Sequence, residues 1–301
     1  MKQIAIVSGK GGTGKTTLTA SFAALAGEVV IADCDVDAAT LHLILNPKVV
    51  SKQEFKGQKL ASIDKAKCVE CRLCEETCRY DAIRNLEIDP VLCEGCGVCA
   101  YICPRSAISL SERISGEAYV SETRFGPMSH AKLGAAEANS GKLVALVRQN
   151  ARQLAERENL SLILIDGPPG IGCPVIASLT GIDLVVVVTE PTLSGLYDLG
   201  RILGVARHFG VIPRVIINMH DINSENAEKI IESCKRNYAE VIAKVPFDLT
   251  VTEAMVAGKP VIEYSPSCMA SKEIRRAWEE IQSILNIGTS LEGDKAPVWE
   301  I

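Results

Sequence analysis

The sequence predicts an α/β fold: a doubly wound, mostly parallel sheet that is interrupted by a small cysteine-rich domain. Two observations lead to this class. Short aliphatic runs alternate with helix-length segments along most of the 301-residue chain. Between the second and third runs, eight of the 12 cysteines fall within residues 68–103. Runs that are apolar on both faces are typical of buried parallel strands with helices on either side.

Six runs are expected to form the sheet, and two amphipathic segments are expected to pack as helices at 141–158 and 271–286. The cysteine-rich domain should occupy residues 60–112, between two parts of the main domain at 1–59 and 113–301. The ending 287–301 is interpreted as a mobile or clasping tail. The strand candidates are QIAIVS (3–8), VVIAD (29–33), LILID (162–166), DLVVVV (183–188), RVIIN (214–218) and IAKVP (242–246).

The cysteine-rich segment repeats internally. IDKAKCVECRLCEETCRYDAI at 63–83 aligns with IDPVLCEGCGVCAYICPRSAI at 88–108, an offset of 25 residues that superposes all four cysteines of each copy. This predicts two copies of one small unit, related by a pseudo-twofold axis.

Composition argues against several classes of protein. The formal net charge is -5 and no long basic run is present, so binding to nucleic acid is not expected. No apolar run is long enough to span a bilayer, which predicts a soluble, cytoplasmic protein without stable membrane insertion. Cysteines at CxxC spacings in such a protein indicate metal binding rather than disulfides.

The stretch GKGGTGKTT at 9–17 follows the first strand candidate and precedes a helical segment. It matches GxxxxGK[ST], in which backbone N–H groups surround phosphates, the lysine reaches the β and γ phosphates, and the hydroxyl is a ligand of Mg²⁺. ATP and Mg²⁺ are therefore the expected ligands, with Lys15 and Thr16 in the two named roles. The expected binding residues here are Gly9, Lys10, Gly11, Gly12, Thr13, Gly14, Lys15, Thr16 and Thr17.

The second lysine of this stretch carries a family resemblance. KGGTGKT, from Lys10 to Thr16, is similar to the deviant Walker A loop of the MinD/ParA class of ATPases. In that class the early lysine reaches across a nucleotide-sandwich dimer to the partner's phosphates. The resemblance therefore implies that Lys10 stabilises charge during phosphoryl transfer, as an arginine finger does elsewhere. A solvated loop lysine is the alternative.

The same resemblance assigns roles to acidic residues after two strands. Asp35, in ADCDVDAA, matches the aspartate that orients the attacking water or acts as a base, with Asp33 and Asp37 as competitors for that role. Asp166, in LILIDGPPG, matches the Walker B aspartate that holds Mg²⁺ through water.

Two further segments complete the nucleotide site by resemblance. The loop that ends at Gly170 resembles the switch II loop, which senses the γ-phosphate. Asn218 resembles the residue that reads the adenine edge, and segment 245–261 resembles the loop that packs on the base. Met219 stands where relatives often have lysine.

Both cysteine runs follow CxxCxxCxxxC, the pattern of bacterial two-cluster ferredoxins, in which the fourth cysteine ligates the other cluster. The alternative is a pair of Cys₄ zinc sites, although zinc usually takes two separated CxxC pairs. The departure from the ferredoxin pattern is Arg79 where the second copy has Pro104. The resemblance implies one [4Fe-4S] cluster on Cys68, Cys71, Cys74 and Cys103, and another on Cys93, Cys96, Cys99 and Cys78.

The remaining cysteines and histidines give weaker signals. Cys34 and Cys173 flank the nucleotide motifs and could approach the nucleotide or a dimer seam, but buried, inert cysteine is the commoner outcome. Cys234 and Cys268 have less reason to be functional. His130 is the histidine to examine, with a plain loop histidine as the alternative.

The combination resembles MinD-superfamily ATPases with an inserted ferredoxin domain, over essentially the whole chain. The resemblance implies ATP hydrolysis in a dimer, either of this chain or with a related ATPase. The preferred hypothesis is an ATP-gated electron donor to a redox partner protein. The alternatives are a maturation factor that delivers clusters to an acceptor protein, and a MinD-like positioning switch.

Overall fold

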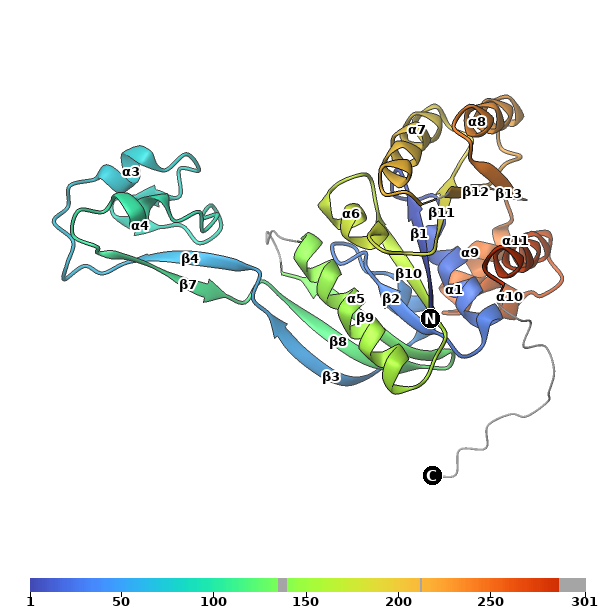
Figure 1. The fold of residues 1–301 in the computed structure, drawn as a ribbon, viewed down its shortest axis with the longest axis horizontal. Coiled ribbons are helices and arrows are strands. Elements are labelled where there is room, and N and C mark those ends of the chain that lie inside the picture. Colours follow the sequence, from blue (N-terminus) through green and yellow to red (C-terminus); the bar gives the residue numbers. More distant parts are fainter. Residues whose placement is uncertain (135–139, 212, 287–301) are drawn as a thin grey trace, which may run out of the picture.

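The computed structural model describes residues 1–134, 140–211 and 213–286. Within these residues the main body contains a nine-stranded sheet (Figure 1). Its strands are parallel from β13 to β9, and β8 and β3 complete it in antiparallel pairing. In order across the sheet they are β13 (Glu240–Val245), β12 (Pro213–Asn218), β11 (Leu184–Thr189), β1 (Lys2–Ser8), β10 (Leu162–Pro169), β2 (Val30–Asp33), β9 (Gly126–Leu133), β8 (Gly116–Thr123) and β3 (Lys48–Phe55).

Helices cover both faces of this sheet, so the doubly wound, mostly parallel class is confirmed. The central strands are buried on both sides because each face packs against its own helical layer. One layer holds α5 (Ser140–Arg157), α6 (Cys173–Leu179), α7 (Leu193–His208) and α8 (Ser224–Arg236). The other holds α1 (Lys15–Ala26), α2 (Leu41–Leu45), α9 (Leu249–Val256), α10 (Val261–Tyr264) and α11 (Met269–Leu285).

The six predicted strands all appear, and the two predicted helices are α5 and α11. Three strands of the sheet, β9, β8 and β3, were not among the sequence candidates. They escape a search for continuous apolar runs because β3 is exposed along nearly its whole length and because β8 and β9 include buried serines and partly exposed positions. The tail at 287–301 lies outside the described residues.

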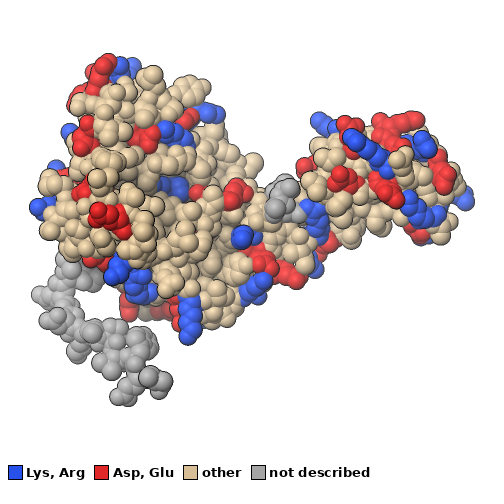
Figure 2. All heavy atoms as spheres, turned by 180° about the vertical axis from the view of Figure 1, so that it is seen from behind, with Lys and Arg blue, Asp and Glu red and all other residues tan. Residues whose placement is uncertain are grey.

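The cysteine-rich segment projects from the body on a two-stranded ribbon of β4 (Gln58–Ile63) and β7 (Ile108–Arg113) (Figure 1). Beyond the ribbon lie α3 (Leu73–Thr77), α4 (Val98–Ile102) and the short pair β5 (Ile83–Arg84) and β6 (Glu87–Ile88). Its buried core consists of Ala61, Cys74, Ile83 and Ile108. Such a small core supplies little stability, so bound metal would add to it. Figure 2 shows Lys, Arg, Asp and Glu interspersed over this projecting part.

The carboxyl ends of the parallel strands meet at one edge of the main sheet. Asp166 of β10 is in register with Asp33 of β2, and Ile6 of β1 lies beside Asp166. The loops after β1, β2 and β10 therefore converge there. In open α/β sheets this edge is where ligands bind.

Candidate functional site

The loop between β1 and α1 is closely packed against its neighbours. Gly14 precedes α1 with φ of 88°, and a Cβ there would lie 2.3 Å from Asn218 Nδ2. A Cβ on Gly9 would lie 2.5 Å from Cβ of Asp198. Side chains are therefore excluded at both positions. The hydroxyl of Thr13 is buried and has no hydrogen-bond partner among the residues that the structure describes, so a polar group is left for a ligand to satisfy.

Lys15 begins α1 and its ammonium group lies between two carboxylates. Nζ is 3.3 Å from Asp35 Oδ2 and 3.3 Å from Asp166 Oδ1. Burial by itself lowers the pKa of Lys15, but Asp166 and the neighbouring carboxylates outweigh burial and raise it. Lys15 therefore carries its positive charge at the helix N-terminus, where phosphate groups are favoured.

Asp166 also accepts hydrogen bonds from two hydroxyl groups of α1. Thr16 Oγ1 lies 2.8 Å from Asp166 Oδ2, and Thr19 Oγ1 lies 3.0 Å from Asp166 Oδ1. A hydroxyl and a carboxylate are the hard oxygen donors that Mg²⁺ prefers. The donor set of Thr16 and Asp166 fits that ion.

The three competing aspartates occupy different environments. Asp35 is mostly buried and faces Lys15, Asp33 is fully buried behind it, and Asp37 is exposed. Burial raises the pKa of Asp35, and Lys15 partly offsets this. Burial raises the pKa of Asp33 well above its ordinary value, and Asp166 adds to the effect. Of the three carboxylates, Asp35 is the one that both contacts Lys15 and is partly accessible to solvent.

The side chain of Lys10 contacts the loop that joins β11 to α7 and the first turn of α7. Its Nζ lies 2.6 Å from Glu190 Oε1 and 3.0 Å from Ser194 Oγ, with Thr192 Oγ1 at 3.3 Å. Sequence reasoning missed these three residues, although TEPTLS directly follows a predicted strand and so lies at the ligand-binding edge. The role of Lys10 at a partner's phosphates stays a prediction.

Two other predicted residues contact the loops of the site. Asn218 Nδ2 donates to the backbone oxygen of Thr13 at 2.9 Å, and its role at adenine stays a prediction. Gly170 has φ of 93° and its N–H donates to the Ser8 oxygen at 2.8 Å. This bond ties the loop after β10 to the end of β1, directly before the phosphate-binding loop.

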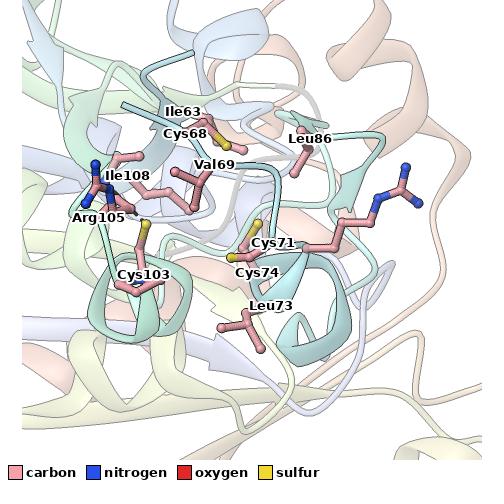
Figure 3. Close-up of a pocket in the computed structure, with 13 residues that line it drawn as sticks. Ile63, Cys68, Val69, Cys71, Leu73, Cys74, Leu86, Cys103, Arg105 and Ile108 are labelled. Carbon is pink, nitrogen blue, oxygen red and sulfur yellow. Dashed lines mark hydrogen bonds between the residues drawn. The ribbon is translucent and has the colours of Figure 1, made fainter. Parts of the chain in front are cut away.

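The cysteines assemble into two separate groups in the projecting part. One pocket, the first cysteine pocket, is lined by Cys68, Cys71, Cys74 and Cys103, whose thiols surround a common space (Figure 3). Apolar side chains, including Ile63 and Ile108, complete its wall. The fourth cysteine of the second run thus joins the first three cysteines of the first run.

A second pocket, the second cysteine pocket, is lined by the complementary set. Cys78, from the end of the first run, lies with Cys93, Cys96 and Cys99 of the second run. Four thiols around an apolar space are the donor set that [4Fe-4S] clusters require, so the residues fit that group. Within residues 1–134, 140–211 and 213–286, no three or more His, Cys, Asp or Glu side chains converge as they would on a single metal ion.

The four remaining cysteines differ in their environments: Cys34 and Cys234 are buried, Cys268 is partly buried and Cys173 is exposed. Cys34 is fully buried, and burial raises the pKa of its thiol strongly. Burial also raises the pKa of Cys234 to about 11. The Cys268 sulfur accepts a hydrogen bond from the Ser271 N–H at the start of α11. Cys173 is exposed at the start of α6.

His130 lies within β9 rather than in a loop. Its Nε2 is 2.8 Å from Ser121 Oγ, and its ring stacks on Tyr119 with centroids 5.1 Å apart. Burial lowers the pKa of His130 to about 4, so the ring is neutral at pH 7. These contacts are consistent with a structural role for His130 in the sheet.

Comparison with known proteins identifies the family. The CobQ/CobB/MinD/ParA nucleotide binding domain matches residues 4–261. The chain belongs to this family. An uncharacterized protein of Methanocaldococcus jannaschii is 33% identical to this MinD/ParA-type chain over 287 residues, which cover 94% of the chain and 97% of that protein. Membership makes the chain an ATP-binding P-loop protein of the MinD/ParA type.

The fold agrees with solved members of the family. The septum site-determining protein MinD of Pyrococcus horikoshii, solved with Mg-ADP, superposes with a TM-score of 0.59 and 20% identity, covering 95% of this chain and 98% of that one. At this identity the likeness shows the fold alone. Among the described residues, no helix combines the length and apolar character that crossing a bilayer requires.

Part of the chain is also similar to a protein of a different class. The ion-translocating oxidoreductase complex of Methanosarcina acetivorans contains a protein that is 36% identical to this chain over 66 residues. The match covers 21% of this chain and 25% of that protein.

Proposed function

We propose that this MinD/ParA-type chain hydrolyses ATP in a nucleotide-closed dimer and couples that cycle to electron transfer through two resident [4Fe-4S] clusters. The observation that carries the proposal is the sorting of eight cysteines into two pockets of four, each combining three from one run with the fourth from the other. The partial likeness to a component of an oxidoreductase complex supports a redox role.

The nucleotide site contains the groups that phosphoryl transfer needs. Lys15 would neutralise the β and γ phosphates, exchanging its contacts with Asp35 and Asp166 for phosphate oxygens. Thr16 and Asp166 would hold Mg²⁺. Asp35, released from Lys15, would orient the attacking water. These groups would neutralise developing charge or hold the reactants in place, and these two effects supply most of the catalysis of phosphoryl transfer.

A second chain would complete this site. The ammonium group of Lys10 contacts Glu190 in the loop before α7 and Ser194 in the first turn of α7. The first turns of that helix expose Leu193 and Tyr197, which are 73% and 70% accessible. Exposed apolar side chains of this kind suit an interface between two copies of the chain. In that dimer, Lys10 would leave Glu190 and contact the phosphates bound to the partner.

A chain of backbone hydrogen bonds connects the nucleotide site to the projecting part. The oxygen of Val36, next to Asp35, accepts from Leu133 N–H at 3.2 Å, at the end of β9. The following residue, Gly134, donates to the Ser115 oxygen at 2.9 Å. Ser115 lies at the base of the β4–β7 ribbon, so a shift of the Asp35 loop acts on the ribbon through few intermediates.

Ser115 also fixes the other strand of the ribbon base. Its N–H donates to the Phe55 oxygen at 2.8 Å, and its buried hydroxyl accepts from Gly57 N–H at 2.7 Å. A Cβ on Gly57 would lie 2.4 Å from the Phe55 ring, so this junction admits only glycine without rearrangement. The junction is therefore a defined structural link rather than a loose linker.

In the cysteine pockets, bound [4Fe-4S] clusters would supply one-electron transfer. The chain itself contributes the thiolates and the apolar walls that limit access of water. Backbone N–H groups contribute as well, since those of Ala107 and Arg105 lower the pKa of the Cys103 thiol. A thiolate at that position is thereby favoured for metal binding.

The experiment that tests the proposal begins with anaerobic analysis of iron, sulfide and zinc in the full chain. We expect about eight irons and eight sulfides per chain, because two [4Fe-4S] clusters contain that number. Cys103→Ser should then perturb the signal of one cluster and Cys78→Ser that of the other. Cys234→Ser, at a buried cysteine outside both pockets, is the matched control.

Three outcomes would redirect the proposal. Stoichiometric zinc without sulfide would replace the clusters by Cys₄ zinc sites. Substoichiometric iron that moves to an apo-acceptor protein would indicate a cluster carrier instead of an electron donor. If both clusters are complete but the chain does not hydrolyse ATP, the protein would instead act as a switch that senses bound nucleotide.

A further inference from the structure

We propose that Arg72 and Arg105 raise the reduction potential of the cluster in the first cysteine pocket above that of the cluster in the second. An electron that enters the projecting part would then reside in the first pocket at equilibrium. The inference rests on the proposed function, because it requires a [4Fe-4S] cluster in each pocket. The internal repeat gives the two sites the same set of cysteine ligands, and the inference ranks their reduction potentials.

The side chains that line the two pockets differ in charge. Among the described residues, Arg72 and Arg105 line the first pocket and no acidic residue does. The second pocket is lined by one cation and one acid, Arg79 and Glu94. The formal charge of the lining side chains is thus positive at the first pocket and balanced at the second.

Aligning the two copies of the repeat shows that charged residues of one copy correspond to uncharged residues at the equivalent positions of the other. With the offset of 25 residues, Arg72 corresponds to Gly97 and Arg105 corresponds to Tyr80. Glu94 corresponds to an uncharged residue, Val69. The two halves of the module therefore keep their thiols in common and differ in the charges around them.

Both arginines are exposed, and no carboxylate of the described residues pairs with either of them. Within the described part of the chain, the guanidinium groups of Arg72 and Arg105 form no ion pair and no hydrogen bond. At another wall of the first pocket, Lys65 donates to the Leu86 oxygen while Glu75 accepts from the Leu86 N–H. These two opposite charges offset each other, and among the described residues the charged side chains that line the pocket itself are the two arginines.

The expected direction follows from the charge of the reduced state. A cluster gains one negative charge when it takes up an electron, so neighbouring cations and N–H donors favour reduction and carboxylates oppose it. Two N–H···S bonds of the first pocket act in the same direction. Ala107 N–H donates to Cys103 Sγ at 3.3 Å, and Glu70 N–H donates to Cys68 Sγ at 3.4 Å.

The repeat also supplies a conservative set of variants. Arg72 has φ of 60° and its counterpart Gly97 has φ of 82°, so Arg72→Gly removes the charge without straining the backbone. Arg105→Gln removes the second charge, and Glu94→Gln removes the acid of the other pocket. Arg72→Lys retains the charge and serves as the control.

The test is an anaerobic potentiometric titration of the full chain, monitored by EPR, after iron and sulfide have been quantified. Wild type should give two separate one-electron steps. The double variant Arg72→Gly, Arg105→Gln should lower the higher potential and leave the lower one in place. Glu94→Gln should raise the lower potential, and Arg72→Lys should reproduce wild type. Cys71→Ser, which alters one ligand of the first pocket, assigns the steps by displacing the higher one.

Several results would overturn the inference. Two wild-type potentials that coincide, a shift of the lower step in the arginine variant, or displacement of the lower step by Cys71→Ser would each contradict the order. With about eight irons present, these results would leave the proposed clusters intact. Absence of iron and sulfide would instead remove the proposed function, and this inference with it.

Discussion

Lys10 and Glu190 form an ion pair with 2.6 Å between Nζ and Oε1, and this pair ties the phosphate-binding loop to the loop that precedes α7. Glu190 is largely buried, with 13% of its side chain exposed. The lysine that the family resemblance directs to a partner chain is thus held within its own chain. In the proposed closed dimer, in which Lys10 contacts the partner's phosphates, this pair would have to separate.

Replacing Glu190 should therefore ease dimer formation. Glu190→Gln removes a contact worth about 1 kcal/mol and should strengthen the MgATP-dependent dimer by roughly fivefold. Sedimentation velocity with and without MgATP measures the change. Glu225→Gln, which breaks the exposed pair with Lys229, is the matched control. Unchanged or weaker dimerisation in Glu190→Gln would show that the pair does not restrain Lys10.

Removing Lys15 should separate nucleotide binding from the cysteine pockets. Lys15→Ala should abolish MgATP binding, measured with a fluorescent ATP analogue, and leave the iron content unchanged. The variant should also unfold more easily, by about 3 kcal/mol at neutral pH, because Asp35 and Asp166 lose their shared cation. Loss of iron in a variant that remains folded would contradict the independence of the two sites.

Asp33 should make the free protein less stable as pH rises. Its pKa is raised above the ordinary 3.8, chiefly by burial, so the folded state binds a proton more tightly than the unfolded state. Stability from this group is present at low pH and is lost as pH rises from about 3.8 through the raised pKa.

The variant Asp33→Asn tests this dependence, because it keeps the acceptor for Asp35 N–H and removes the charge. We expect a higher Tm than wild type, with a difference that grows with pH and then becomes constant. Thermal unfolding over a pH series measures it, with exposed Asp37→Asn as control. A difference that shrinks as pH rises would contradict the direction of the pKa shift.

Ser115 should transmit the nucleotide state to the cysteine pockets. Ser115→Ala removes the acceptor of Gly57 N–H and should weaken the ribbon base by about 1–3 kcal/mol. ATP hydrolysis should persist, while the change that MgATP causes in the EPR signal should shrink. Ser121→Ala, at another buried serine toward the far end of β8 from this junction, is the control. An undiminished EPR response in Ser115→Ala would exclude this junction as the link.

Continuous apolar runs and motif spacing predicted the central strands, because fully buried parallel strands leave a strong signal in sequence. They could not predict β3, β8 and β9, because the β8–β9 hairpin joins the sheet through pairing of β9 with β2 and of β8 with β3, which are distant in sequence. Likewise, GKGGTGKTT pointed to Lys10, but its contact with Glu190 joins residues 180 positions apart and has no local pattern.

The cysteine spacing was informative for a different reason. The repeat of CxxCxxCxxxC implied the exchange of Cys78 and Cys103 between two ligand sets only through resemblance to ferredoxins. The structure places each of these cysteines beside the three from the other run. The charges around the pockets, in contrast, depend on which side chains the fold places at their rims.

The most direct test of nucleotide-coupled electron transfer is anaerobic EPR of the dithionite-reduced full chain, recorded with and without MgATP. The proposal predicts low-potential [4Fe-4S] signals that change in shape or potential when MgATP binds, and that lose this response in Lys15→Ala. Signals that are identical with and without MgATP in the wild-type chain would contradict the coupling.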